Sequence, residues 1–252
     1  MKTVIIIPAR YGSSRYKGKP LVKILNREMV LRVADICSKV VGKKNLFIAT
    51  DSKKISKVVK DAGYKYLITS KTCLTGTDRV AQASLKVKSK IYVNVQGDEP
   101  TINPKDIRSV IKAKVKYPNH VICGYDKVHK FDDVKSSYLP KVVVNSKKEL
   151  IYMSRAVVPA SKKINSDGSL LGKRISYYKQ VCIYAFNSSE LKKFYSKKKK
   201  SDTESIEDIE ILRFFDLDVK IKMVKLNSNS VAVDTINDVK KAERLIKKNL
   251  SV

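Results

Sequence analysis

The chain has 252 residues, of which 43% are hydrophobic and 31% charged, a composition typical of a packed globular protein and not of a disordered one. Its 53 basic and 24 acidic residues give a net charge of +29. The longest apolar run, Val4–Ile7, is far shorter than the roughly 20 residues of a membrane-spanning helix, and Pro8 interrupts it too early for a signal peptide. We therefore expect a soluble, cytoplasmic protein with no membrane insertion.

In the first half of the chain, short β-branched runs alternate with segments of helical periodicity. Buried strands are expected over residues 3–7, 46–49, 64–68 and 91–95. Helices are expected over residues 30–41, 55–62, 80–87 and 107–115. Ser52 and Thr77 are candidate N-caps, and Pro104 suits the first turn of a helix. This alternation is typical of a parallel sheet covered by helices.

In the second half, strand-like segments are separated by shorter turns. They cover residues 121–125, 140–144, 150–153, 181–186 and 219–224. A helix is expected over residues 204–215, and a closing helix begins at Thr235 or Asn237. The pattern predicts a single α/β domain, residues 1–252, with an open, mostly parallel twisted sheet and a mixed or antiparallel extension around residues 121–186.

The first strand leads into a segment rich in glycine, serine and cations, residues 8–20. In an open α/β sheet, ligands bind beyond the carboxyl ends of the strands. Gly12 and Gly18 permit close approach of the backbone to a ligand. The side chains that suit phosphate oxygens are Arg10, Ser13, Ser14, Arg15 and Lys19. The spacing fits neither GxxxxGK[ST] nor GxGxxG, so the segment is either a phosphate loop of another kind or a basic surface turn.

Carboxylates follow the strand at 91–95 and precede the closing helix. Asp98 and Glu99 come directly after Gly97, and Asp234 lies shortly before the closing helix. Mg²⁺ binds through one or two carboxylates plus substrate phosphate. Asp98 and Asp234 are therefore candidate Mg²⁺ ligands, and the alternative is a pair of ordinary acidic turns.

The net charge admits a different class of function, that of a basic nucleic-acid-binding protein. The excess is mostly lysine and is spread along the chain, with its densest run at Lys197–Lys200. No helix-turn-helix, zinc-finger or aromatic RNA-binding pattern accompanies it. The scattered cysteines lack the CxxC pairing of a zinc site. We therefore interpret the lysines as a solvated surface and expect no nucleic-acid partner.

Short motifs are spread over nearly the whole chain. They are Ile7-Pro8-Ala9-Arg10-Tyr11, Gly18-Lys19-Pro20-Leu21, Ala49-Thr50-Asp51, Thr75-Gly76-Thr77-Asp78-Arg79, residues 93–100, Ser154-Arg155, Ile183-Tyr184-Ala185-Phe186, residues 204–213 and Val233-Asp234-Thr235. Together they resemble the 3-deoxy-manno-octulosonate (Kdo) cytidylyltransferase family, the CMP-Kdo synthetases. The resemblance implies a Rossmann-like nucleotidyltransferase fold, a homodimer, and a role in lipopolysaccharide or capsule synthesis.

The resemblance also implies a reaction and its residues. The anomeric hydroxyl of a sugar acid attacks the α-phosphorus of CTP and releases pyrophosphate, with Mg²⁺ as cofactor. Catalysis is assigned to Arg10, Lys19, Asp98 and Asp234, of which Asp98 and Asp234 hold the metal. Nucleotide binding is assigned to Pro8, Ala9, Arg10, Ser13, Ser14, Lys19, Thr75, Gly76 and Gln96. Sugar binding is assigned to Arg79, Arg155, Gln180 and Glu210, with Arg79 as the first choice for the sugar carboxylate.

Two positions leave alternatives open. Glu210 shares its helical spacing with Glu204 and Glu207, so the three can equally form the polar face of a helix. Gln180 stands where the family has a sugar-contacting histidine, and an amide hydrogen-bonds but carries no charge. The acceptor is therefore Kdo, an analogue such as 8-amino-Kdo, or another acid such as sialic acid. The Gln-Gly-Asp-Glu-Pro motif at residues 96–100 favours the Kdo branch.

Overall fold

The computed structural model describes residues 2–12, 16–128, 131–160, 169–170, 173–174 and 176–250. The strands are β1 (Thr3–Ala9), β2 (Lys23–Ile24), β3 (Arg27–Glu28), β4 (Leu46–Thr50), β5 (Lys65–Ile68), β6 (Ile91–Val95), β7 (Val121–Lys127), β8 (Lys141–Val144), β9 (Leu150–Ser154), β10 (Ser169–Leu170), β11 (Lys173–Arg174), β12 (Tyr178–Phe186) and β13 (Ile221–Lys225). The α-helices are α1 (Met29–Val41), α2 (Lys53–Asp61), α3 (Gly76–Ser84), α4 (Pro104–Lys116), α5 (Phe131–Lys135), α6 (Ser188–Ser196), α7 (Asp202–Glu207), α8 (Arg213–Asp216) and α9 (Ile236–Leu250). Short 3₁₀ helices are η1 (Lys19–Leu21), η2 (Lys43–Asn45) and η3 (Glu210–Leu212).

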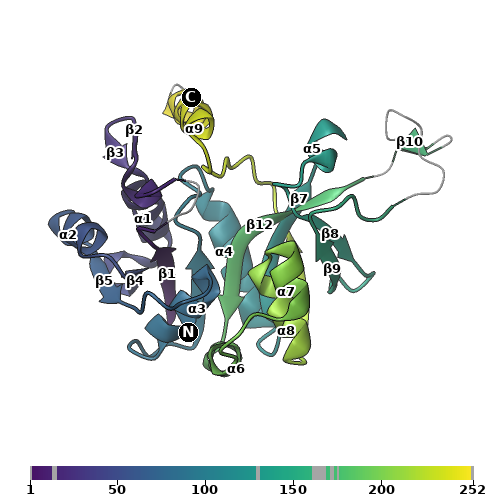
Figure 1. Ribbon diagram of the computed structural model, residues 1–252, viewed down its shortest axis with the longest axis horizontal. Helices are drawn as coiled ribbons and strands as arrows, with labels where there is room; N and C mark the ends of the chain where they lie inside the picture. The colour runs from purple at the N-terminus through teal and green to yellow at the C-terminus, as the bar shows by residue number, and fades with distance from the viewer. Residues whose placement is uncertain are drawn as a thin grey trace.

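The main sheet has the strand order β13-β7-β12-β6-β1-β4-β5 (Figure 1). Neighbouring strands are parallel except β12, which runs antiparallel to both β6 and β7. The strands β8 and β9 form an antiparallel pair joined to β12. The order along the chain reverses between β1 and β6, since β4 and β5 lie on the other side of β1. Such a reversal is where ligands bind in open α/β sheets.

Two apolar cores cover the two faces of the sheet. Alternate residues of a strand point to opposite faces, so Ile5 and Ile7 pack with residues of α1, α2 and α4. Val4 and Ile6 pack with residues of α3 and α6. All five residues of β6 are buried, and all of them except Asn94 are apolar. The predicted α/β class and the mostly parallel sheet with an antiparallel extension are confirmed.

Most of the expected elements form, but three details of the prediction are wrong. The strand over residues 64–68, expected to be buried, forms as β5 at the edge of the sheet, where Ile68 is 46% exposed. Thr75, not Thr77, caps α3, because its side chain and that of Asp78 form a reciprocal capping box. The expected helix over 204–215 is broken at Asp208, whose φ of 49° is left-handed. Ile206, expected on the apolar stripe of that helix, is 83% exposed. The single-domain organisation stays a prediction.

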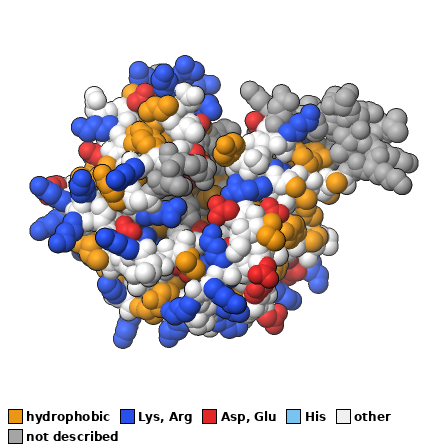
Figure 2. All heavy atoms as spheres, viewed as in Figure 1, with side chains coloured by type: hydrophobic (Ala, Val, Ile, Leu, Met, Phe, Trp, Pro, Cys, Tyr) orange, Lys and Arg blue, Asp and Glu red, His pale blue; other side chains and the backbone are white. Residues whose placement is uncertain are grey.

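The last helix, α9, packs Val239 and Ala242 against Ile24 and Met29 from the first third of the chain. No helix within the described ranges is long and apolar enough to cross a membrane. Lys and Arg side chains are scattered over the visible face of the molecule and do not gather in one patch (Figure 2). This spread agrees with the interpretation of the lysines as a solvated surface.

Candidate active site

A cavity of about 430 Å³ lies beyond the carboxyl ends of β1 and β6. All predicted site residues that the structure describes line it. They are Pro8, Ala9, Arg10, Lys19, Thr75, Gly76, Arg79, Gln96, Asp98, Arg155, Gln180, Glu210 and Asp234. Ser13 and Ser14 lie outside the described residues. Topology thus places in one cavity residues that are far apart in sequence, as predicted for this edge of the sheet.

Lys19 joins the two predicted metal ligands. Its Nζ donates to Asp98 Oδ2 at 2.8 Å and to Asp234 Oδ1 at 3.0 Å. Although burial lowers the pKa of Lys19, the two carboxylates together raise it above its usual value. Gly18, with φ of 75°, begins the 3₁₀ turn that carries Lys19, in a conformation that favours glycine.

Backbone contacts bring the two carboxylates together. The N–H of Val233 donates to the carbonyl of Asp98 at 2.9 Å, and this bond places Asp234 beside the turn that follows β6. Gly97 precedes Asp98 and lies against β1, because a Cβ there would come within 3.0 Å of the carbonyl oxygen of Pro8. The turn is therefore fixed closely against the first strand.

The donor set fits Mg²⁺. Two carboxylates that share one ammonium are close enough to share one cation, and Mg²⁺ needs only one or two carboxylates beside water and phosphate. In the described part of the chain, no group of three or more His, Cys, Asp or Glu side chains could hold a metal ion. Beside this pair, burial and the charge of Asp98 raise the pKa of Glu99 to about 7.

The start of α3 forms one wall of the cavity. Thr75 caps the helix, and a Cβ on Gly76 would lie 3.0 Å from the Gln96 amide, so the helix and the β6 turn are in close contact. Glu210 reaches this wall from η3: its Oε2 accepts from the N–H of Thr77 at 2.8 Å and its Oε1 accepts from Gln96 Nε2 at 2.8 Å. A carboxylate at a helix N-terminus is electrostatically favourable.

Arg79, assigned to the sugar carboxylate, is 2% exposed. Its guanidinium donates to Asp51 Oδ2 at 3.1 Å and to Thr69 Oγ1 at 2.5 Å. These bonds attach α3 to the residues that directly follow β4 and β5. A contact between Arg79 and the sugar stays a prediction, and Asp51 already occupies one side of the guanidinium.

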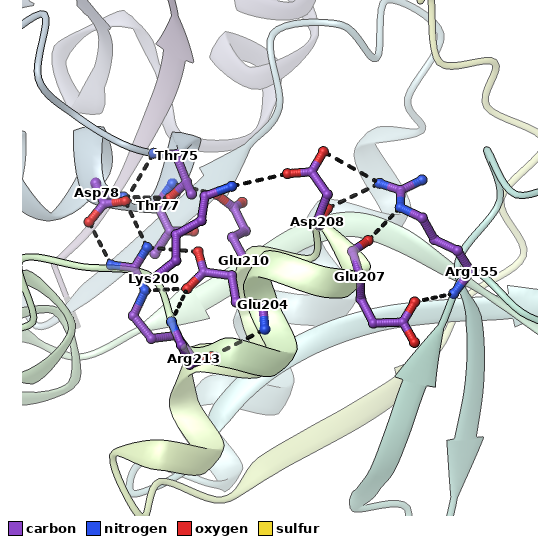
Figure 3. Close-up of polar contacts among 11 residues, drawn as sticks. Thr75, Thr77, Asp78, Arg155, Lys200, Glu204, Glu207, Asp208, Glu210 and Arg213 are labelled. Atoms are coloured by element: carbon purple, nitrogen blue, oxygen red, sulfur yellow. Dashed lines mark hydrogen bonds and ion pairs between the residues drawn. The ribbon is translucent and has the colours of Figure 1, made fainter.

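Arg155 and Gln180 come from the antiparallel part of the sheet. The backbone N–H of Arg155 donates to Glu207 Oε2 at 2.7 Å, and its guanidinium donates to the carbonyls of Glu207 and Asp208 at 2.5 and 3.0 Å (Figure 3). The guanidinium also donates to the carbonyl of Ser137 at 2.9 Å. Gln180 Nε2 donates to the hydroxyl of Tyr184 at 2.9 Å. Their sugar contacts stay predictions.

Several residues that shape the cavity were not predicted. Asp51 binds Arg79, and Glu207 binds Arg155. Asp78 caps α3, and the spacing Thr75-x-x-Asp78 is a capping signature that could have indicated it. The partners of Asp51 and Glu207 lie 28 and 52 residues away along the chain, so no local pattern reveals them.

A cavity at the strand-order reversal of an α/β sheet, with cations and a carboxylate pair that can share a metal, defines the class of nucleotide-binding α/β enzymes. Comparisons with known proteins narrow the class. A family model described as cytidylyltransferase matches residues 4–221. The 3-deoxy-manno-octulosonate cytidylyltransferase of Escherichia coli is 31% identical over 99% of this chain and 98% of its own length.

Two further relatives agree. The mitochondrial 3-deoxy-manno-octulosonate cytidylyltransferase of Arabidopsis thaliana is 34% identical over 99% of this chain and 85% of its own length. A solved structure of CMP:2-keto-3-deoxy-manno-octonic acid synthetase complexed with CTP superimposes with a TM-score of 0.88, at 31% identity, over 99% of this chain and 100% of that one. The chain therefore belongs to the cytidylyltransferase family, as a CTP-dependent enzyme related to the 3-deoxy-manno-octulosonate cytidylyltransferases.

Proposed function

We propose that this enzyme transfers CMP from CTP to the anomeric hydroxyl of a 3-deoxy-2-ulosonic acid, with Kdo as the first candidate, and releases pyrophosphate. The observation that carries the proposal is the continuity of the cavity. One cavity joins the Lys19–Asp98–Asp234 cluster to a second wall formed by Arg155, Gln180 and residues of η3. Nucleotide and acceptor can thus meet in a single cavity. The near full-length similarity to Kdo cytidylyltransferases supports the choice of acceptor.

Positioning and charge neutralisation dominate nucleotidyl transfer. We propose that Arg10 and Lys19 bind the triphosphate, that Thr75, Gly76 and Gln96 contact the nucleotide, and that Asp98 and Asp234 hold Mg²⁺. When bound there, Mg²⁺ offsets the charge of the phosphates and lowers the pKa of the attacking hydroxyl. To reach the phosphates, the ammonium of Lys19 has to exchange its carboxylate partners for phosphate oxygens.

Gln180 favours a second candidate acceptor, 8-amino-Kdo. A neutral amide bound to Tyr184 stands where the family's histidine would add positive charge when protonated. Without that positive charge, this position does not repel the ammonium group of an amino-sugar acceptor. The lipopolysaccharide or capsule role implied by the family applies to either acceptor.

The test is pyrophosphate release from CTP in the presence of Mg²⁺ and one acceptor: Kdo, 8-amino-Kdo or sialic acid. Release with Kdo supports the first candidate, and a clear preference for the amino sugar replaces it with the second. Asp98→Asn should abolish release, whereas Asp61→Asn, on the exposed end of α2, should not change it. Release with none of the three acids contradicts the proposed acceptor class.

We also propose a homodimer formed through the extension around residues 121–186. Ile151 supports this, because it is 55% exposed on β9, which within the described strands pairs with β8 alone. Light scattering coupled to size-exclusion chromatography should give about 57 kDa, twice the 28.5 kDa of the chain. Ile151→Asp should shift the mass toward the monomer, and a wild-type monomer contradicts the proposal.

A further inference from the structure

Arg213 is a fully buried cation that binds two carboxylates. Its Nη1 and Nη2 donate to Asp78 Oδ1 and Oδ2 at 2.7 and 3.1 Å. Its Nε and Nη2 donate to Glu204 Oε2 and Oε1 at 2.6 and 2.7 Å. The guanidinium carbon lies 3.9 Å from the centre of the Phe194 ring. The residue itself is 0% exposed and lies outside the cavity lining.

Each of these carboxylates also caps a helix (Figure 3). Asp78 forms a capping box with Thr75 at the start of α3. Glu204 forms one with Ser201 at the start of α7. The guanidinium therefore joins two capping boxes whose carboxylates, those of Asp78 and Glu204, are 126 residues apart in the chain. Because each capping box is formed within its own helix, we expect each helix start to keep its local structure when the arginine is replaced.

The two helices lead to two different parts of the cavity lining. Thr75 and Gly76, at the start of α3, belong to the wall proposed to bind the nucleotide. The segment after α7 turns at Asp208 and presents Ile209 and Glu210 to the wall proposed to bind the acceptor. Glu210 makes the second connection between the walls, through the N–H of Thr77. Its position depends on the segment that Arg213 fixes.

We propose that Arg213 is a positioning residue for the transfer reaction: through Asp78 and Glu204 it sets the spacing between the nucleotide wall and the acceptor wall. This inference rests on the proposed function of the two walls. In-line attack is sensitive to misplacement of about 1 Å, which can lower a rate by roughly 10²-fold. Loss of Arg213 should therefore impair the reaction of bound CTP with the acceptor much more than the binding of CTP alone.

Lys114 offers a matched control for the loss of a buried cation. It is 2% exposed, and its Nζ donates to both oxygens of Glu190 at 2.7 Å. Glu190 is likewise the capping-box carboxylate of a helix, α6, with Asn187. Neither Lys114 nor Glu190 lines the cavity. Lys114→Met thus removes the same kind of interaction from the same protein without touching either wall.

The experiment compares Arg213→Gln, Arg213→Lys and Lys114→Met at a temperature where thermal melts show each variant folded. The CTP dissociation constant comes from calorimetry and kcat/KM for the acceptor from pyrophosphate release. For Arg213→Gln we expect a fall of at least about 30-fold in kcat/KM with less than about a threefold change in CTP affinity. Arg213→Lys should recover part of the loss, because an ammonium restores the charge but not the fork that spans both carboxylates.

Lys114→Met should lower stability but change neither kinetic quantity by more than about threefold. The proposal is overturned if Lys114→Met loses as much acceptor turnover as Arg213→Gln. It is also overturned if Arg213→Gln weakens CTP binding and turnover by one common factor, or if Arg213→Lys recovers nothing.

A readout without acceptor separates this inference from the proposed function. In the wild type, CTP should slow amide hydrogen exchange both in residues 75–84 and in residues 204–213. In Arg213→Gln, CTP should protect only the first segment. If the wild type uses none of the tested acids but shows this coupling, the acceptor assignment fails and the role of Arg213 stands. If CTP protects both segments equally in the variant, Arg213 does not connect the two walls.

Discussion

Replacing Lys19 by methionine should strengthen binding of a divalent metal ion to the protein without nucleotide. Lys19 Nζ lies 2.8 and 3.0 Å from the two carboxylates, so its positive charge competes with the metal for them. A unit charge at about 4 Å contributes about 1 kcal/mol in water and about 4 kcal/mol at an effective dielectric constant of about 20. The side chains of Asp98 and Asp234 are 32% and 39% exposed, which places the pair near the aqueous limit. We expect about 1.4 kcal/mol, or about tenfold in affinity.

The assay is electron paramagnetic resonance of free Mn²⁺, titrated with protein in the absence of CTP. Lys23→Met is the control, because Lys23 lies exposed on the same segment of the chain. This variant should leave the Mn²⁺ affinity unchanged. Lys19→Met should also weaken CTP binding, since the ammonium is proposed to bind the triphosphate. Equal or weaker Mn²⁺ binding by Lys19→Met would refute the competition between the ammonium and the metal ion.

Three further predictions concern stability. Lys114→Met leaves Glu190 buried without its cation and should lower the free energy of unfolding by about 3–5 kcal/mol, or the melting temperature by roughly 10 °C. The double variant Lys114→Met, Glu190→Gln should recover part of this loss. Burial raises the pKa of Glu207, but the hydrogen bonds from Arg155, Ser154 and Tyr152 outweigh burial, so the pKa in the folded protein is lowered. The ionised Glu207 therefore stabilises the fold above its unfolded pKa, and this stabilisation disappears as the pH falls through the folded pKa. Glu207→Gln should flatten the acid limb of a pH-stability curve. Gly97→Ala places a Cβ 3.0 Å from a β1 carbonyl and should cost about 1–3 kcal/mol in denaturant unfolding, whereas Gly12→Ala, with nothing within 4 Å, should not.

The central strands of the main sheet, such as β1 and β6, could be predicted from sequence because they are buried on both faces. Ile91–Val95 is predicted and observed with the same bounds. A continuous β-branched run bounded by polar turns has few other compact solutions. The position of the cavity followed from the same reasoning, since ligands bind beyond the carboxyl ends of such strands.

The helix over 204–215 could not be predicted correctly from its periodicity. Glu207 and Glu210 are three residues apart, and one regular helix would place them on the same face. In the structure Glu207 binds β9 and Glu210 binds the start of α3. These two distant partners favour the left-handed turn at Asp208, and the signal for it lies outside the local sequence.

The sequence by itself determined the fold class, the family and the edge of the sheet where the residues of the site gather. These depend on burial patterns and short motifs, which are local properties of the chain. Only the tertiary structure decided which charges pair with each other. Lys19 binds carboxylates 79 and 215 residues away, and Arg213 binds one that is 135 residues away. The physical reason is that an ion pair depends on distance in space, and the packing of the sheet and helices sets that distance.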